Sequence, residues 1–112
     1  MAGTLFERII RREIPANIVY EDDDVVAFRD RNPQAPVHVL VVPRKPIPKV
    51  AYAADADAGL LGRLLLAAAK VARQEGLVGY RLVVNNGEEA GQTVFHLHVH
   101  VLGGRPMTWP PG

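Results

Sequence analysis

Hydrophobic side chains along the chain recur with two periods, one typical of strands and one typical of helices. Short alternating or unbroken apolar runs predict five strands. Their ranges are Asn17–Tyr20, Val25–Phe28, Val37–Val42, Tyr80–Val84 and Val94–Leu102. A helical period predicts a short helix that begins at Thr4 and ends before Pro15, and a long helix from about Asp57 to Glu75.

Local signals support both helices. Thr4 and Glu7 have the spacing of a capping box, in which each side chain bonds to the backbone of the other residue. The long helix has charged residues on one face and an apolar stripe on the other. This stripe consists of Leu60, Leu61, Leu64, Leu65, Ala68, Val71 and Ala72. Gly76 follows as a candidate C-terminal cap.

The order of these elements predicts the fold class. The first two strands flank the acidic turn Glu21–Asp24, which indicates a hairpin, and only the long helix lies between strands. We therefore expect an α+β fold with a five-stranded, mostly antiparallel sheet and two helices. Val37–Val42 is almost entirely apolar and should be a central strand. A length of 112 residues predicts a single domain over residues 1–112.

Composition narrows the class of protein further. The chain has 13 basic and 12 acidic side chains that are dispersed along it, so we expect no nucleic-acid partner. It has no cysteine, which excludes disulfides and thiolate metal ligands and is consistent with a cytoplasmic protein. Met1–Glu13 lacks the apolar core of a signal peptide, and the apolar run Leu64–Ala69 is too short to span a membrane. We expect no membrane association.

Three of the four histidines occupy alternate positions in the last predicted strand. On a strand, His96, His98 and His100 would share one face, and Leu97, Val99 and Val101 would face the core. The outer two would lie roughly 13 Å apart, too far for all three to bind one metal ion. His38, on the other strongly apolar strand, is a candidate neighbour. This pattern favours catalysis by imidazole over a metal site or a structural role.

The segment before these histidines is small and polar. It contains Asn85, Asn86 and Gly87 and then Ala90-Gly91-Gln92-Thr93, whose glycines permit close approach of a ligand to the backbone. Alone it would be interpreted as an ordinary connecting loop. Beside three histidines it indicates a phosphate site, although the glycine-lysine pattern of a P-loop is absent.

The motif His96-Leu97-His98-Val99-His100-Val101-Leu102 resembles the signature of the histidine-triad (HIT) family of nucleotide-binding proteins. Further segments resemble the Hint branch of that family and extend the resemblance over nearly the whole chain. They are Asp30, Pro33–His38, Gly91–Phe95, Gly103-Gly104-Arg105 and Trp109-Pro110-Pro111-Gly112.

The resemblance implies a fold, an activity and a mechanism. Hint proteins are homodimers in which two five-stranded sheets join into one. They bind purine nucleoside monophosphates and hydrolyse their phosphoramidates, releasing AMP or GMP and an amine. His98 would be the nucleophile and would form a nucleotidyl-histidine that water hydrolyses. The scheme needs no cofactor and no metal.

The resemblance also assigns roles to other residues. His38 and His96 would support the catalytic ring, and His100 would assist at the phosphate. Asn85, Gly91, Gln92 and Thr93 would surround the phosphate. Asp30 would accept hydrogen bonds from the ribose, although its position before Asn32-Pro33 also suits a turn. The base pocket would be lined by Phe6, Ile9 and Phe28, for which core packing is nearly as good an interpretation. Arg31 departs from the family, because that position beside the base is commonly apolar.

Two other functions stay open at this point. The protein could be a nucleotide-binding partner protein whose catalysis is incidental, or a metalloenzyme built on a His-x-His pair. Related enzymes that cleave diadenosine polyphosphates or transfer nucleotides to sugars are further options, and the Trp-Pro-Pro-Gly ending favours the Hint branch over them.

Overall fold

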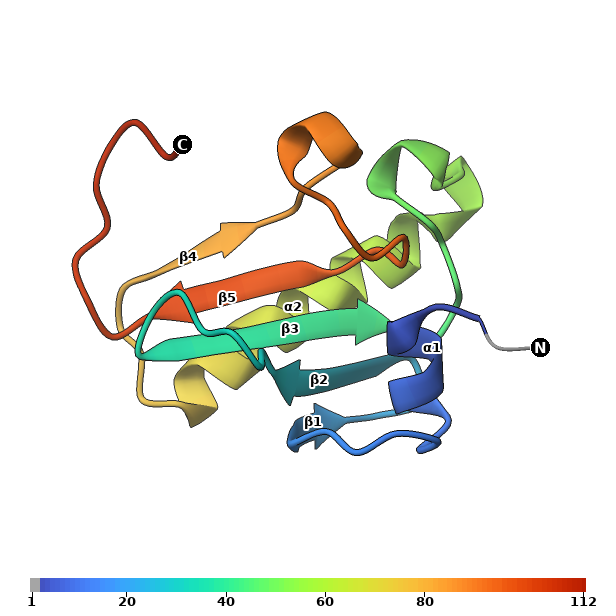
Figure 1. The fold of residues 1–112 in the computed structure, drawn as a ribbon, viewed down its shortest axis with the longest axis horizontal. Coiled ribbons are helices and arrows are strands. Elements are labelled where there is room, and N and C mark those ends of the chain that lie inside the picture. Colours follow the sequence, from blue (N-terminus) through green and yellow to red (C-terminus); the bar gives the residue numbers. More distant parts are fainter. Residues whose placement is uncertain (1–2) are drawn as a thin grey trace.

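The fold, described for residues 3–112 in a computed structural model, is a five-stranded sheet with a long helix on one face and a short helix on the other (Figure 1). The sheet has the order β1-β2-β3-β5-β4, and all four pairings are antiparallel. The predicted α+β fold with an antiparallel sheet is confirmed. The helices and strands are α1 (Leu5–Ile10), β1 (Ile18–Glu21), β2 (Val25–Arg29), β3 (Val37–Pro43), α2 (Ala58–Gln74), β4 (Tyr80–Val83) and β5 (Val99–Gly103), and the 3-10 turns are η1 (Val50–Tyr52), η2 (Asp55–Asp57) and η3 (Glu88–Ala90).

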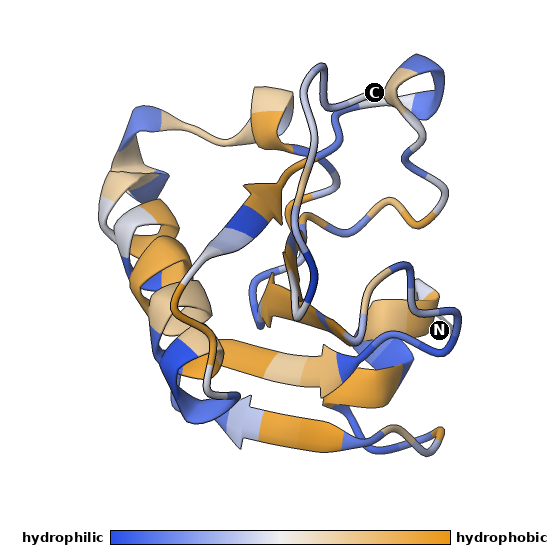
Figure 2. Cartoon of the chain, turned by 90° about the vertical axis from the view of Figure 1, so that its left-hand side faces the viewer, coloured by the Kyte–Doolittle hydropathy of each residue, from blue (hydrophilic) through white to orange (hydrophobic). Residues whose placement is uncertain are grey.

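The strand register separates a packed face of the sheet from a face that carries histidines. Val39 of β3 pairs with Val101 of β5, and both are buried beneath α2. One residue along, Leu40 pairs with His100 on the opposite face, where Phe6 of α1 belongs to a second apolar cluster. Figure 2 shows the hydrophobic strands between these two layers. Because side chains alternate across a strand, the apolar pairs that hold α2 also determine which face the histidine takes.

The capping box predicted at Thr4 is present, and α1 is shorter than predicted. The Thr4 hydroxyl accepts a hydrogen bond from the Glu7 amide, and the Thr4 amide donates to the Glu7 carboxylate. The helix ends at Ile10 rather than near Pro15, because Arg12 takes a left-handed conformation with φ 60°. The Glu13 amide then donates to the Arg8 carbonyl and closes the helix end. Glycine usually takes this position, so the presence of arginine there did not predict the end of the helix.

The long helix has the two ends that its sequence predicted. Asp57 precedes it, and its carboxylate accepts a hydrogen bond from the Ala54 amide and pairs with Lys45 at 2.6 Å. After the helix, Gly76 has φ 77° and the Leu77 amide donates to the Ala72 carbonyl. This is the glycine-capped end that the pattern predicted.

The last strand begins later than predicted. Residues 94–98 lie outside β5, which begins at Val99. In the observed register Leu97 would pair with Pro43, which has no amide hydrogen to continue the ladder. The Leu97 amide instead donates to the Ile47 carbonyl at 2.7 Å. His96 and His98 are therefore on an irregular segment, and the expected strict alternation of three histidines on one strand is wrong.

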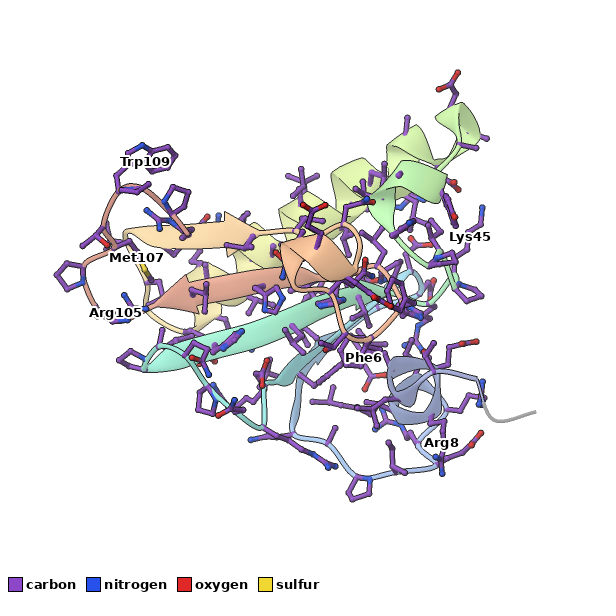
Figure 3. The ribbon with its side chains drawn as sticks, turned by 45° about the horizontal axis from the view of Figure 1, so that its top comes forward. Phe6, Arg8, Lys45, Arg105, Met107 and Trp109 are labelled. Atoms are coloured by element: carbon purple, nitrogen blue, oxygen red, sulfur yellow. The ribbon has the colours of Figure 1, made fainter. Side chains whose placement is uncertain are left out.

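The C-terminal segment runs along the end of the sheet away from α1. Figure 3 shows Arg105, Met107 and Trp109 at the opposite end of the molecule from Phe6. Trp109 is 80% exposed and lies over the Arg81 guanidinium. Within residues 3–112, no helix has both the length and the apolar character needed to cross a membrane.

Candidate active site

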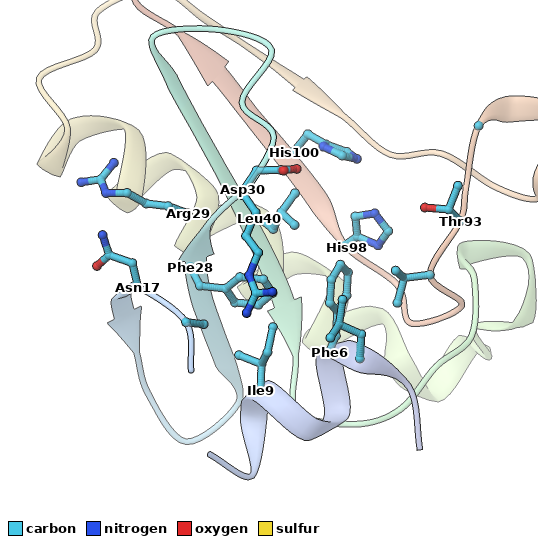
Figure 4. Close-up of a pocket in the computed structure, with 15 residues that line it drawn as sticks. Phe6, Ile9, Asn17, Phe28, Arg29, Asp30, Leu40, Thr93, His98 and His100 are labelled. Atoms are coloured by element: carbon cyan, nitrogen blue, oxygen red, sulfur yellow. The ribbon is translucent and has the colours of Figure 1, made fainter. Parts of the chain in front are cut away.

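A cavity of about 380 Å³ opens on the histidine-bearing face of the sheet. Figure 4 shows Thr93 and His98 toward one end, Asn17 and Arg29 toward the other, and Phe6, Phe28 and Ile9 between them. Apolar side chains thus lie between two polar regions of the lining, and Asp30 lies above them. Its lining consists of Leu5, Phe6, Ile9, Ala16, Asn17, Phe28, Arg29, Asp30, Arg31, Leu40, Gly91, Thr93, Val94, His98 and His100.

The His98 ring is fixed in one tautomer by a backbone carbonyl. Its Nδ1 lies 2.7 Å from the carbonyl oxygen of His96, which can only accept a hydrogen bond. The proton is therefore on Nδ1, and the neutral ring keeps a lone pair on Nε2. The edge of Phe6 packs against this ring with a centroid distance of 4.9 Å. His98 is held as a buried, neutral base or nucleophile.

His38 and His100 form a second pair, whose protons are also fixed by the backbone. The Gln34 amide donates to His38 Nδ1 at 3.0 Å, so the proton of the neutral His38 ring is on Nε2. This Nε2 lies 2.9 Å from His100 Nδ1, which must accept. The remaining nitrogen of His100, Nε2, then carries a proton. The prediction that His38 neighbours the histidine strand is confirmed.

A lone pair and an N–H donor therefore sit on adjacent rings at the cavity. The His98 and His100 ring centroids are 4.9 Å apart, and both residues line the cavity. An electrophilic centre bound between them would meet a nucleophile from one ring and a hydrogen-bond donor from the other. This arrangement suits an attack on a negatively charged group such as a phosphate.

Burial keeps these rings neutral near pH 7. Desolvation lowers the pKa of His98 below its usual 6.5, although the carbonyl of His96 and the charge of Asp30 act the other way. Desolvation, together with the neighbouring His98 and His38, lowers the pKa of His100 to about 4. Burial lowers the pKa of His38 too, against the opposing charge of Asp30. A nucleophilic imidazole needs this unprotonated form.

Asp30 lies at the cavity and uses its two carboxylate oxygens differently. Oδ1 accepts a hydrogen bond from the Asn32 amide at 2.8 Å, so the interpretation as a turn residue is confirmed. Oδ2 lies 3.4 Å from His38 Nε2 and belongs to the cavity side. One carboxylate thus shapes the loop between β2 and β3 and stays close to the histidines.

His96 is placed apart from the other two members of the triad. Its ring is fully buried, and its Nε2 donates to the Pro43 carbonyl at 2.7 Å. Burial lowers the pKa of His96 as well. Its ring is absent from the cavity lining, because residues 94–98 leave the strand geometry and turn this side chain inward. His96 reaches the site through its carbonyl, which holds His98.

The predicted phosphate loop divides into lining and supporting residues. Gly91 and Thr93 line the cavity, and Gly91 has φ 94°. Gln92 is 2% exposed, and its side-chain amide group forms hydrogen bonds with the backbone of Gly87, Pro48 and Val94. This side chain therefore holds the loop rather than facing the cavity. The backbone N–H groups of Gly91 and Gln92 donate to loop carbonyls and are not available to a ligand. Asn85 lies beside Gly91 but outside the lining.

The predicted apolar residues Phe6, Ile9 and Phe28 line the cavity, and they also form a buried cluster with Leu40. Core packing is therefore confirmed for these residues, and their role in a base pocket stays a prediction. Several residues that line the cavity were not predicted from the sequence, among them Leu40 and Asn17. Leu40 could have been found from the strand pattern, because it is two positions from His38 and shares its face. Asn17 had no such signal, since it reaches the cavity only through the path of the loop before β1.

Residues 11–107 match the model of the HIT domain family. The chain belongs to the HIT family. A HIT-like protein of Synechocystis is 63% identical over 110 residues, which are 97% of this chain and 96% of that one. The crystal structure of a HIT family hydrolase from Legionella pneumophila superposes with a TM-score of 0.96 at 50% identity, and covers 98% of this chain and 100% of its own. The 14 kDa zinc-binding protein of Zea mays is 52% identical over an alignment of 112 positions, which covers 97% of this chain and 88% of that one.

The name of the maize relative prompts a test of whether this HIT protein offers a metal site. Ligand atoms of Asp30, His38 and His100 all lie within 4.8 Å of one another. A metal ion here would take the lone pair of His38 Nε2 and move the ring proton to Nδ1. That proton would then face the Gln34 amide, which already donates to Nδ1. Asp30, His38 and His100 therefore suit a chain of hydrogen bonds. They do not fit a metal site unless the hydrogen bond from the Gln34 amide to His38 is lost.

Proposed function

We propose that this HIT protein is a purine nucleoside phosphoramidate hydrolase of the Hint branch, which releases AMP or GMP from an amine through a nucleotidyl-His98 intermediate. One observation carries the proposal: the Nδ1 proton of His98 is bonded to the His96 carbonyl, so that the Nε2 lone pair is free next to the N–H of His100. The similarity to a solved HIT family hydrolase supports a hydrolytic reaction.

In the first step, His98 Nε2 attacks the phosphorus of the bound phosphoramidate. A P–N bond to His98 forms, the P–N bond to the amine breaks, and the amine leaves with a proton taken up from solvent. The exposed Thr93 hydroxyl at the cavity is suited to relay that proton. The Nε2–H of His100 donates to a phosphate oxygen and offsets the charge that develops there.

In the second step, water attacks the same phosphorus. The bond to His98 breaks, its electron pair returns to Nε2, and a proton from the water passes to solvent. His38 holds His100 in the required tautomer throughout, and the His96 carbonyl does the same for His98. Asp30 Oδ2 accepts hydrogen bonds from the ribose, and Phe6, Ile9 and Phe28 pack on the purine.

We further propose that the protein acts as a homodimer joined at β4. This strand is at one edge of the sheet, and Tyr80 and Leu82 on it, together with Val84 just after it, are each more than a third exposed. Leu82 pairs with Val101 and therefore lies on the α2 side, where Leu65 and Leu66 are also exposed. An unpaired edge beside apolar side chains is a surface that a second copy would cover.

The proposed chemistry is tested by AMP release from adenosine 5′-phosphoramidate in the presence of EDTA. Wild type should turn over, and His98→Ala should lose at least about a thousandfold in kcat while it binds AMP within about tenfold, because the ring acts in the transition state. Arg73→Met, on the exposed face of α2, is the control and should match wild type. Mass spectrometry of quenched wild type should detect a nucleotide attached to His98.

The alternatives give different results in the same assay. A metalloenzyme would lose activity with EDTA and regain it with added metal. A nucleotide-binding partner protein would bind AMP tightly and release none from the phosphoramidate. Turnover that persists in His98→Ala would remove His98 from the role of nucleophile.

A further inference from the structure

The end of the cavity away from His98 carries polar side chains that the proposed chemistry does not use. Asn17 and Arg31 line the cavity, and Arg31 bonds to Pro15, which precedes Ala16 and Asn17 in the chain. In Figure 4, Asn17 lies on the far side of Phe28 from His98 and Thr93. Since the phosphate must reach His98, a nucleotide that fills the cavity places its base toward this end. Polar groups there are in position to read the edge of the base.

Arg31 is held across this end of the cavity by a backbone contact. Its Nη2 donates to the Pro15 carbonyl at 3.0 Å, which ties the loop after β2 to the segment before β1. Among residues 3–112, the Arg31 side chain forms no other hydrogen bond. One nitrogen is thereby anchored, and the rest of the guanidinium fork remains able to donate.

We propose that Arg31 selects 6-oxopurine bases, so that guanosine and inosine substrates are preferred over adenosine substrates at the active site proposed above. A guanidinium has N–H donors and no acceptor. Guanine and hypoxanthine present two acceptors, O6 and N7, on one edge, and arginine pairs with that edge in a bidentate manner. Adenine presents N7 beside an amino group, whose hydrogens would face the hydrogens of the guanidinium.

The same cation could act by attracting the phosphate, but its position argues against this. Arg31 bonds to Pro15, in the segment that leads to Ala16 and Asn17 at the base end, whereas the lone pair of His98 marks the phosphate end. The inference rests on the proposed function for the direction in which the nucleotide lies. It goes beyond that function because it names a residue that distinguishes among purines.

The experiment compares guanosine, inosine and adenosine 5′-phosphoramidates as substrates for wild type, Arg31→Met and Arg73→Met. Methionine keeps an apolar stem and removes every donor. Wild type should prefer guanosine and inosine over adenosine by about tenfold in kcat/KM, the lower end of what a bidentate contact supplies. In Arg31→Met the three values should converge to within about twofold, mainly through loss of the two 6-oxopurines. Arg73→Met removes the same charge from α2 and should keep the wild-type ratio.

Three results would overturn the inference. Wild type could use all three substrates equally, or Arg31→Met could lose the same activity toward all three. The inosine substrate could also behave like the adenosine substrate, which would mean that the 2-amino group of guanine is recognised instead. Calorimetric binding of GMP, IMP and AMP to the same proteins separates this inference from the proposed function. A 6-oxopurine preference in binding that depends on Arg31, without any turnover, would sustain the base selection and reject the hydrolase.

Discussion

At the scale of single residues, His98 and His100 are adjacent rings that differ in which nitrogen carries the proton. The difference comes from the backbone: the His96 carbonyl accepts from His98 Nδ1, whereas the Gln34 amide acts on His100 through His38. The His96 carbonyl and the Gln34 amide are backbone groups that do not titrate, so they hold these rings independently of pH. The site is therefore prepared for attack before a substrate arrives.

The pKa shifts predict how activity depends on pH. Burial lowers the pKa of His98 below 6.5 and that of His100 to about 4, so both rings take up a proton at a lower pH than a free imidazole. The kcat/KM for a phosphoramidate should accordingly decrease on the acidic side with a midpoint below pH 6.5. A pH–rate profile between pH 4.5 and 8 measures this.

An acidic limb centred above pH 6.5 would contradict the prediction, because it would require a nucleophile that is more basic than free histidine. Phe6→Ala is an informative variant, since the Phe6 edge packs on the His98 ring and helps to exclude water from it. The midpoint of the acidic limb should move toward 6.5 in this variant, whatever happens to the overall rate.

At the scale of elements, one strand end and one strand edge set the properties of the site. Pro43 ends the ladder between β3 and β5, which releases residues 94–98 to turn His96 inward and bring its carbonyl to His98. On the other side of β5, β4 leaves an edge without a strand neighbour in residues 3–112. The strand end positions the His98 ring, which we propose to be the nucleophile, and the strand edge is the surface proposed for a second copy.

The proposed dimer predicts a specific effect of charge on this edge. Leu82→Asp would place a carboxylate at an apolar contact and should convert a dimer into a monomer at micromolar concentration, because burying an unpaired charge costs several kcal/mol. Sedimentation equilibrium measures the result. Val50→Asp adds the same charge to a comparably exposed side chain on η1 and should stay dimeric. A wild type that is monomeric at high concentration would reject the dimer.

At the scale of the whole molecule, four histidines have lowered pKa values in the fold. Each ring is neutral in the folded state at pH values where the unfolded chain already binds a proton. Folding stability must then be complete above pH 6.5 and fall as the pH drops toward the folded pKa values. For His100 alone, a shift from 6.5 to about 4 corresponds to at most about 3 kcal/mol, and its partial exposure reduces this.

The urea midpoint of unfolding should therefore decrease steadily between pH 6.5 and 5. This interval lies above the range where the carboxylates titrate, so the histidines dominate it. His100→Asn, which removes the most strongly shifted of these groups, should flatten the dependence. A midpoint that stays constant from pH 6.5 to 5 in wild type would show that burial does not hold the rings neutral.

The sequence by itself determined the elements and most of their order. The alternation of apolar residues gives five strands, the seven-residue apolar stripe gives α2, and Gly76 ends that helix, because these signals act between residues close in the chain. The same local reasoning placed His38 beside the histidine segment, since both lie on strands that belong in the centre of the sheet.

Only the tertiary structure decided which histidine does what. Pro43, Gln34 and Ile47 are distant in sequence from the triad. The Pro43 and Ile47 carbonyls hold the inward turn of His96, and the Gln34 amide fixes the tautomer of His100 through His38. In the same way Gln92 became a support of the loop, and Arg31 came to bond with Pro15 at the cavity. The pattern of side chains along the sequence shows which residues are available for chemistry. Which ring nitrogen of a histidine carries the proton depends on backbone partners that only the fold brings together.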